Sequence, residues 1–144
     1  MIEIRPMRTE DAPQVTGLLA QLGYPSELDS VKVRLKGILG AAGRRMLVAV
    51  PADESRVDGY VGVERRLALE EDEHVEITGL VVDSAARQSG VGRALVMAAE
   101  RWAVSQGIHV VVVRSNVVRL ESHPFYESIG YQRTKTSHIY RKEL

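Results

Sequence analysis

The most informative segment of the chain, residues 80–93, reads Leu80-Val81-Val82-Asp83-Ser84-Ala85-Ala86-Arg87-Gln88-Ser89-Gly90-Val91-Gly92-Arg93. An apolar strand pattern here passes through a glycine-bearing turn into a helical pattern, in which Leu95 and Ala99 continue the apolar face that begins at Val91. Such a turn exposes unpaired N–H groups at the positive end of the helix dipole. The segment therefore predicts an anion site, with phosphate as the expected ligand.

The composition of the turn favours a phosphate site, although a glycine-rich turn selected for tightness alone is the alternative. Gly90 and Gly92 let the backbone approach a ligand closely, and Arg87 and Arg93 add positive charge. A dinucleotide-binding fingerprint would need glycine or alanine at position 95, where Leu95 stands. A nucleotide-hydrolase phosphate loop would need a lysine, and the sequence has none from residue 37 to 134.

Working outward from this segment, the apolar periodicity predicts an α+β sheet with helices on its faces. Thr9 is the expected N-cap of the first helix, and Ser26 or Ser30 that of the second. The expected order is a strand near 2–6, helices over 12–22 and 31–39, strands over 46–50, 59–65 and 74–82, a helix over 91–107, a strand over 108–113, a helix over 122–129, and strands near 131–134 and 137–141.

Length and charge define the broad class of the protein. The chain has 144 residues, with 19 Lys and Arg balanced by 19 Asp and Glu, and no cysteine. We expect one domain over residues 1–144, without disulfides, cysteine nucleophiles or a metal site. Zero net charge argues against nonspecific binding to nucleic acid or anionic membranes, and no apolar run approaches the length of a membrane span. The expected compartment is the cytoplasm.

Two motifs in the right order resemble those of the GNAT superfamily of N-acetyltransferases. Its signature Gln/Arg-x-x-Gly-x-Gly/Ala is matched by residues 87–92, with the customary apolar positions Leu80 and Val82 upstream. A second match comprises Asn116, Arg119, Ser122, Phe125-Tyr126 and Gly130-Tyr131. The resemblance covers essentially the whole chain and implies a single domain with a mixed, mostly antiparallel central sheet flanked by helices.

The resemblance implies an acetyl-CoA site along the segment 80–93. Backbone amides from Gln88 to Arg93 would hold the pyrophosphate, and the backbone of residues 80–82 would pair with pantetheine. Asn116 matches a position that hydrogen-bonds pantetheine, although an asparagine after a strand is also an ordinary turn residue. Gly79 inside a strand pattern suggests a β-bulge, and the family has a bulge here that opens a slot for the pantetheine arm.

The resemblance also assigns the catalytic groups. Tyr126 matches the family's general acid for the departing thiolate, although a tyrosine on an amphipathic helix is otherwise a core residue. Glu76 is the candidate general base acting through water, with a solvent-facing strand residue as the alternative. His74 and His123 are weaker candidates. A backbone N–H near residue 80 or 81 is the expected oxyanion donor.

The predicted function is transfer of acetyl from acetyl-CoA to a primary amine by direct attack on the thioester. The alternative is a non-catalytic acyl-CoA sensor or interaction module of the same fold. The expected acceptor is a small molecule or peptide amine, and the fold is compatible with a homodimer. The acidic run from Glu70 to Glu73, followed by Glu76, suggests a cationic acceptor, with a solvated loop as the alternative.

Overall fold

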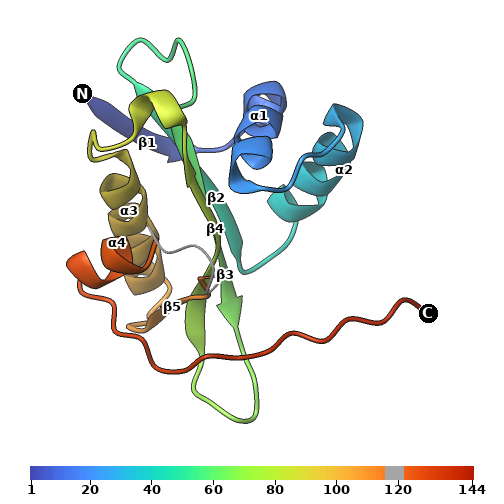
Figure 1. Cartoon of the computed structure of the whole chain (residues 1–144), viewed down its shortest axis with the longest axis vertical. Coiled ribbons are helices and arrows are strands. Elements are labelled where there is room, and N and C mark those ends of the chain that lie inside the picture. The colour runs from blue at the N-terminus through green and yellow to red at the C-terminus, as the bar shows by residue number, and fades with distance from the viewer. Residues whose placement is uncertain (116–121) are drawn as a thin grey trace. The chain divides into compact units, whose positions relative to one another are not determined.

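The computed structural model describes residues 1–115 and 122–144. These residues fall into two compact units, Met1–Val113 and Arg114–Leu144. The first unit holds a five-stranded sheet of order β1-β2-β3-β4-β5 and helices α1 to α3 (Figure 1). The second holds helix α4 (Ser122–Ser128) and the C-terminal segment. The predicted α+β class is confirmed.

The sheet is antiparallel from β1 through β4 and parallel between β4 and β5. Its strands are β1 (Ile2–Pro6), β2 (Arg44–Pro51), β3 (Gly59–Arg66), β4 (His74–Val82) and β5 (Val111–Val113). The last strand is shorter than the predicted segment 108–113. The reason is that the Ile108 N–H still donates to the Ala103 carbonyl of the preceding helix, at 2.9 Å.

Two helices precede β2 and one follows β4. They are α1 (Ala12–Leu22), α2 (Leu28–Leu39) and α3 (Val91–Ser105). The N-cap of α2 is Glu27, so neither predicted serine caps this helix. The Ser26 hydroxyl instead donates to the Tyr24 carbonyl at 3.1 Å, which uses it in the turn that follows α1.

The helices cover opposite faces of the sheet, and two neighbouring residues of β3 show this. Tyr60 belongs to a buried cluster with Leu18 of α1 and Leu35 of α2. A methyl group on Gly59 would instead stand 3.1 Å from Leu95 of α3. Because successive strand residues point to opposite faces, α1 and α2 lie on one face and α3 on the other (Figure 1).

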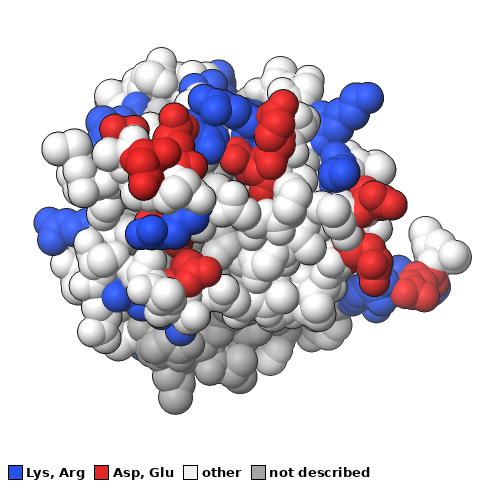
Figure 2. Space-filling view, turned by 90° about the horizontal axis from the view of Figure 1, so that it is seen from above, with Lys and Arg blue, Asp and Glu red and all other residues white. Residues whose placement is uncertain are grey.

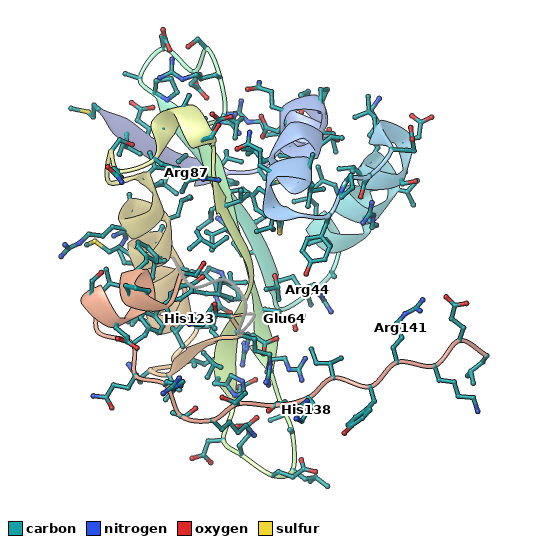
Figure 3. The ribbon with its side chains drawn as sticks, viewed as in Figure 1. Arg44, Glu64, Arg87, His123, His138 and Arg141 are labelled. Carbon is teal, nitrogen blue, oxygen red and sulfur yellow. The ribbon has the colours of Figure 1, made fainter. Side chains whose placement is uncertain are left out.

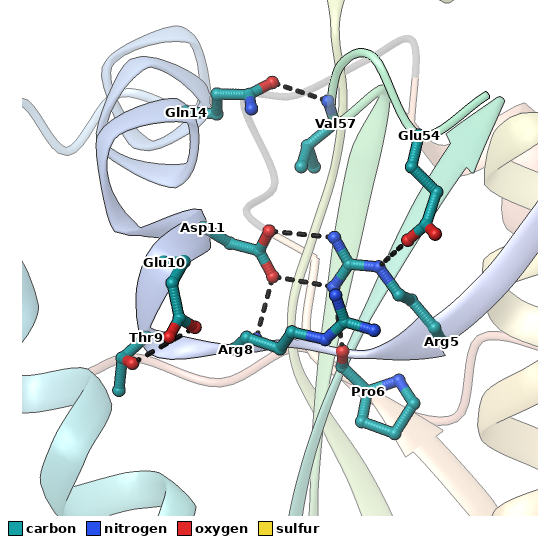
Figure 4. Close-up of polar contacts among 9 residues, drawn as sticks. All are labelled: Arg5, Pro6, Arg8, Thr9, Glu10, Asp11, Gln14, Glu54 and Val57. Atoms are coloured by element: carbon teal, nitrogen blue, oxygen red, sulfur yellow. Dashed lines mark hydrogen bonds and ion pairs between the residues drawn. The ribbon is translucent and has the colours of Figure 1, made fainter.

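Asp11 connects β1 to the start of α1 (Figure 4). It is buried, and its carboxylate accepts from both terminal nitrogens of Arg5, at 2.8 and 2.9 Å, and from the Arg8 N–H at 2.8 Å. Burial opposes ionisation, but these hydrogen bonds outweigh it and hold the pKa of Asp11 below its ordinary value. Thr9, the predicted cap, lies inside a short 3-10 turn (Thr9–Asp11), whose N-cap is Arg8.

The two strands predicted near 131–134 and 137–141 are wrong, because the segment 131–144 has no regular secondary structure. A strand requires a partner for its backbone groups and an apolar face to bury. Within the described part of the chain this segment pairs with no strand, and Ile139 and Tyr140 are 92% and 91% exposed. Alternating apolar residues were therefore insufficient evidence for these strands.

Charged side chains of both signs are interspersed over the face seen in Figure 2. Over residues 1–115 and 122–144, no helix has both the length and the apolar character that crossing a bilayer requires.

Candidate functional site

A β-bulge interrupts β4 at Thr78. Gly62 of β3 lies opposite Gly79, whereas the next residue, Val63, lies opposite Ile77, so Thr78 is the extra residue. The predicted bulge at Gly79 thus lies one position earlier. Gly62 leaves room for the Thr78 side chain, because a methyl group on it would stand 2.8 Å from the Thr78 hydroxyl oxygen and would make that side chain move.

The bulge reverses which edge of β4 each peptide group faces. On the hairpin side of the bulge, the Val75 N–H donates to the Val110 carbonyl at 3.0 Å, toward β5. Beyond it, the Val81 carbonyl oxygen faces β3, where a methyl group on Gly59 would stand 2.6 Å away. In a regular strand, residues an even number apart face the same edge. Val75 and Val81 face opposite edges, so the extra residue has switched the alternation.

This switch presents the peptide groups of Leu80 and Val82 at the outer edge of β4. The Asp83 N–H donates to the Asp58 carbonyl at 2.7 Å, on the β3 side. Because facing alternates along a strand, the peptide groups of Val81 and Asp83 face β3, and those of Leu80 and Val82 face the outer edge. Pairing with β5 ends at Ile77, so no described strand covers this edge beyond the bulge. Of the predicted pantetheine-binding run, Leu80 and Val82 therefore turn their backbone groups toward the outer edge, while Val81 pairs with β3.

The turn after β4 is held by side chains from two elements. The Asp83 carboxylate accepts from the Ala85 N–H at 2.9 Å and caps a 3-10 turn (Ser84–Ala86). Gln21 of α1 accepts from the Ser84 N–H at 2.9 Å and donates to Asp83 at 3.2 Å. Sequence analysis missed this support, because it joins residues 62 positions apart.

The turn then enters α3 through two residues with positive φ. Gln88 has φ of 63° and Gly90, the N-cap of α3, has φ of 88°. This conformation carries no steric penalty for glycine and some for glutamine. Nothing lies within 4 Å of a Cβ built on Gly90, so its conformation, not crowding, requires glycine.

The leading amides of α3 have no acceptor within the helix. The first backbone hydrogen bond at the start of α3 is donated by the Ala94 N–H to the Gly90 carbonyl, at 3.0 Å. The N–H groups of Val91, Gly92 and Arg93 precede this bond and have no intrahelical acceptor. Such amides at a helix N-terminus can bind an anion, and a phosphate group is chemically suited to this position.

Arg87 and Arg93 add charge to this loop. Both side chains are exposed, and no described carboxylate lies within ion-pair distance of either. Figure 3 shows Arg87 beside the end of β4, next to the N-terminus of α3. The structure thus brings together the predicted residues 80–82 and 87–93.

Glu76 lies on β4 on the other side of the bulge, and is buried. It is paired in register with Glu64 of β3, which is also buried. Arg66 lies 3.4 Å from a Glu64 oxygen and 3.9 Å from a Glu76 oxygen. The structure therefore excludes a solvent-facing Glu76; its role as a base stays a prediction. His74 is buried, and its Nδ1 lies 3.2 Å from the Asp72 carbonyl.

Tyr126 lies in the second unit, on α4. Its ring packs edge-on against Phe125 and Tyr131, with centroid distances of 5.3 and 6.1 Å. The Tyr131 N–H donates to the Tyr126 carbonyl at 3.0 Å and closes the helix. Asn116, predicted to bind pantetheine, lies outside the described residues, and the acid role of Tyr126 stays a prediction.

Tyr60 is a candidate hydrogen-bond donor of the site that sequence analysis missed. Its hydroxyl lies 3.6 Å from the position of a methyl group on Gly79, so the ring covers the strand beside the bulge. Burial, together with the neighbouring Tyr24, raises the pKa of Tyr60 to about 12, which keeps its hydroxyl protonated as a donor. The signal available in the sequence was an aromatic residue on one strand and a glycine on the neighbouring strand.

Comparisons with known proteins agree with this geometry. The family described as the acetyltransferase (GNAT) family matches residues 14–131. Human N-acetylaspartate synthetase is 34% identical over 85 residues, which cover 58% of this chain and 28% of that protein. An uncharacterized N-acetyltransferase of Bacillus subtilis is 29% identical over 93 residues, 64% of each chain. The chain thus matches less than a third of the length of the human relative.

Solved structures share the fold. The aminoglycoside acetyltransferase AAC(6')-Iy, in complex with a bisubstrate analogue of CoA, superposes with a TM-score of 0.86 at 22% identity, covering 100% of this chain and 99% of that one. Glucosamine-6-phosphate N-acetyltransferase from Arabidopsis thaliana has a TM-score of 0.84 at 19% identity, covering 99% of each chain. Together with the match over residues 14–131, the open edge of β4 and the amide-lined loop lead to one conclusion: the chain belongs to the acetyltransferase (GNAT) family.

Proposed function

We propose that the protein is an N-acetyltransferase that transfers the acetyl group of acetyl-CoA to a primary amine. The observation that carries the proposal is the order of two open groups along the chain, first the outward-facing backbone of Leu80 and Val82 at the edge of β4, and then the leading amides of α3, from Val91 to Arg93. Acetyl-CoA has the complementary groups in the same order, since the amides of pantetheine precede an anionic pyrophosphate. The fit is one of hydrogen-bond type, charge and sequence order.

In this proposal the loop and the strand edge have separate tasks. The amides of residues 88–93 bind the pyrophosphate, and Arg87 and Arg93 balance its charge. Leu80 and Val82 pair with the pantetheine amides as an added strand would. When bound, acetyl-CoA supplies an activated acetyl group. The chain contributes binding, orientation and the movement of protons.

The catalytic groups follow the family resemblance. The Leu80 N–H is better suited than the Val81 N–H to stabilise the developing oxyanion, because only Leu80 faces the open edge. Glu76 is proposed to take the proton of the amine through water, and Tyr126 to protonate the departing thiolate. These roles require a neutral amine nucleophile and a direct attack on the thioester.

The acceptor, the location and the assembly are also proposals. Relatives and structural neighbours are named for acetylation of aspartate, aminoglycosides and glucosamine-6-phosphate, so their names share an amine and differ in its charged neighbours. We propose a small-molecule or peptide amine for this chain, with no nucleic-acid or membrane partner. A cytoplasmic protein of one domain over residues 1–144, able to form a homodimer, is the expected setting.

Two measurements on the same preparations test the function. Calorimetry measures acetyl-CoA binding, and thiol release from acetyl-CoA is followed across a panel of amines. The double variant Arg87→Gln, Arg93→Gln should raise the dissociation constant of acetyl-CoA by about tenfold or more, since it removes two charge-assisted contacts. Arg101→Gln, an exposed arginine further along α3, is the matched control and should leave binding unchanged.

The outcomes separate the two function classes. Amine-dependent thiol release supports an enzyme. Binding of acetyl-CoA without amine-dependent release across the panel would support the acyl-CoA sensor instead. Absence of acetyl-CoA binding in the unmodified protein would contradict both.

A further inference from the structure

A cluster of charged side chains lies on the same face of the sheet as Tyr60 and α1. The register places Arg44 of β2 opposite Glu64 of β3, and Glu64 opposite Glu76 of β4. Paired residues share a face, and Glu64 lies an even number of positions from Tyr60 along β3. Arg66, two residues beyond Glu64, joins the same face. We call Arg44, Glu64, Arg66 and Glu76 the charged cluster.

The carboxylates of the charged cluster are buried and its guanidinium groups are exposed. The side chains of Glu64 and Glu76 are 11% and 9% exposed, whereas those of Arg44 and Arg66 are 46% and 48% exposed. Arg44 Nη1 lies 2.7 Å from Glu64, and Arg66 Nη1 contacts both carboxylates. Figure 3 shows Arg44 and Glu64 side by side. The cluster is neutral in sum, but it presents positive charge to the surroundings.

Most hydrogen-bond donors of these two arginines have no acceptor among the described residues. Each guanidinium has five N–H donors in a planar fork. In the part of the chain that the structure describes, the ion pairs of Arg44 and Arg66 involve only Nη1 of each. The buried carboxylates engage one nitrogen of each arginine, so the other N–H groups of each fork are available to a further acceptor. A carboxylate matches that fork in shape and charge.

The position of the cluster sets the distance to the reacting centre. Glu64 is two residues from Gly62, which lies opposite Gly79, and Leu80 is the next residue of β4. At the rise of a strand, Arg44 and Glu64 stand about 10 Å along the sheet from Leu80, and Arg66 lies two residues farther. Resting on the proposed function, we infer that Arg44 and Arg66 bind a carboxylate of the acceptor, so that the substrate is an amino acid or peptide whose carboxylate lies about 10 Å from the acetylated amine.

Three acceptors of equal chain length test this inference: 6-aminohexanoate, 1-aminohexane and 1,6-diaminohexane. They have the same primary amine and differ at the far end, which is anionic, neutral or cationic. The expected order has 6-aminohexanoate at least about tenfold above 1-aminohexane in kcat/KM, as one well-placed charged pair allows. The diamine should be the poorest of the three.

Variants assign this preference to the arginines. Arg44→Gln and Arg66→Gln should each lower the ratio of kcat/KM for 6-aminohexanoate to that for 1-aminohexane by about fivefold or more, mainly through KM. Because both acceptors are measured on one variant, effects on folding or on Glu76 cancel in the ratio. The pair Arg44→Gln, Glu64→Gln removes one charge of each sign and should lower the ratio equally. Arg65→Gln is the matched control, since Arg65 lies on the opposite face and pairs with Glu73.

Each contrary outcome has its own meaning. Equal activity with the three acceptors, a preference for the diamine, or a ratio unaffected by the variants would overturn the inference. A preference for the diamine would favour the acidic run Glu70–Glu73 as the acceptor site. If other amines are acetylated and these three are not, the carboxylate inference fails and the proposed function stands. If no amine is acetylated, the proposed function itself fails.

Discussion

A proline at position 82 tests whether the bulge turns the outer edge of β4 toward a ligand. In the structure, Val81 and Asp83 face β3, and the Val82 N–H faces outward. Proline removes an N–H, and within a sheet it is tolerated only where that N–H faces away from the neighbouring strand. Val82→Pro should therefore remove a donor that only a ligand uses. Val81→Pro, one residue away, should remove a donor of the β3–β4 ladder.

The effects of the two variants should differ in magnitude and in the property that each one changes. Val81 is 6% exposed and belongs to the buried cluster with α1 and α2, so Val81→Pro loses a ladder hydrogen bond and core packing together. We expect a loss of about 3 kcal/mol or more in the free energy of unfolding. Val82→Pro should cost less than about 1 kcal/mol in stability. It should weaken acetyl-CoA binding by one net hydrogen bond, about 0.5–1.5 kcal/mol, or roughly 2- to 13-fold.

Urea unfolding and calorimetric titration with acetyl-CoA, run on both variants and on the unmodified protein, measure these effects. The expected pattern is a stable Val82→Pro protein with weakened binding and a strongly destabilised Val81→Pro protein. Equal destabilisation by both prolines would refute the switched alternation. So would a stable Val82→Pro protein that binds acetyl-CoA as tightly as the unmodified one.

Four further predictions concern other sites. Gly59→Ala places a methyl group 2.6 Å from the Val81 carbonyl oxygen and should lower the free energy of unfolding in urea by about 1–3 kcal/mol; an unchanged midpoint would mean that the strands yield at no cost. The pKa of Asp11 lies below its ordinary value, so its contribution to stability is present above about pH 4 and is lost as the pH falls through the folded-state pKa. Asp11→Asn should therefore be less stable than the unmodified protein at pH 7 by about 1–3 kcal/mol, with the gap closing in acid, and a gap independent of pH would contradict the assignment. Tyr126→Phe should reduce turnover by about 10²-fold with little change in acetyl-CoA binding, whereas unchanged turnover would make Tyr126 a packing residue. Gly92→Val should raise the dissociation constant of acetyl-CoA by about tenfold or more, and normal binding by the folded variant would argue against the loop assignment.

Local patterns predicted the part of the fold that positions the site. The strand over His74–Val82 and the start of α3 at Val91 match the predicted positions, because strand alternation, glycine and helical periodicity are all local signals. The role of the loop between them as a phosphate site stays a prediction, made from its glycines, its arginines and the family resemblance. Gln88, with its positive φ, gave no such signal, since most glutamines adopt negative φ.

Features that depend on pairing between distant residues could not be predicted. The extra residue is Thr78 and not Gly79, which follows from the register with β3. The burial of Glu76 follows from its place opposite Glu64 and from Arg66 lying against both. The sequence predicts only that Glu76 lies on a strand. The prediction of two C-terminal strands was wrong for the same reason, because alternation along one segment cannot show whether a partner strand is present.

Amide hydrogen exchange, measured by NMR with and without saturating CoA, tests most directly whether the β4 edge and the adjoining loop form the acetyl-CoA site. The N–H groups of Leu80, Val82 and residues 88–93 should exchange at least about tenfold more slowly with CoA, because each gains an acceptor. The Val81 N–H, which already faces β3, should change little. Protection confined to other parts of the chain, or equal protection of residues 80, 81 and 82, would contradict this assignment.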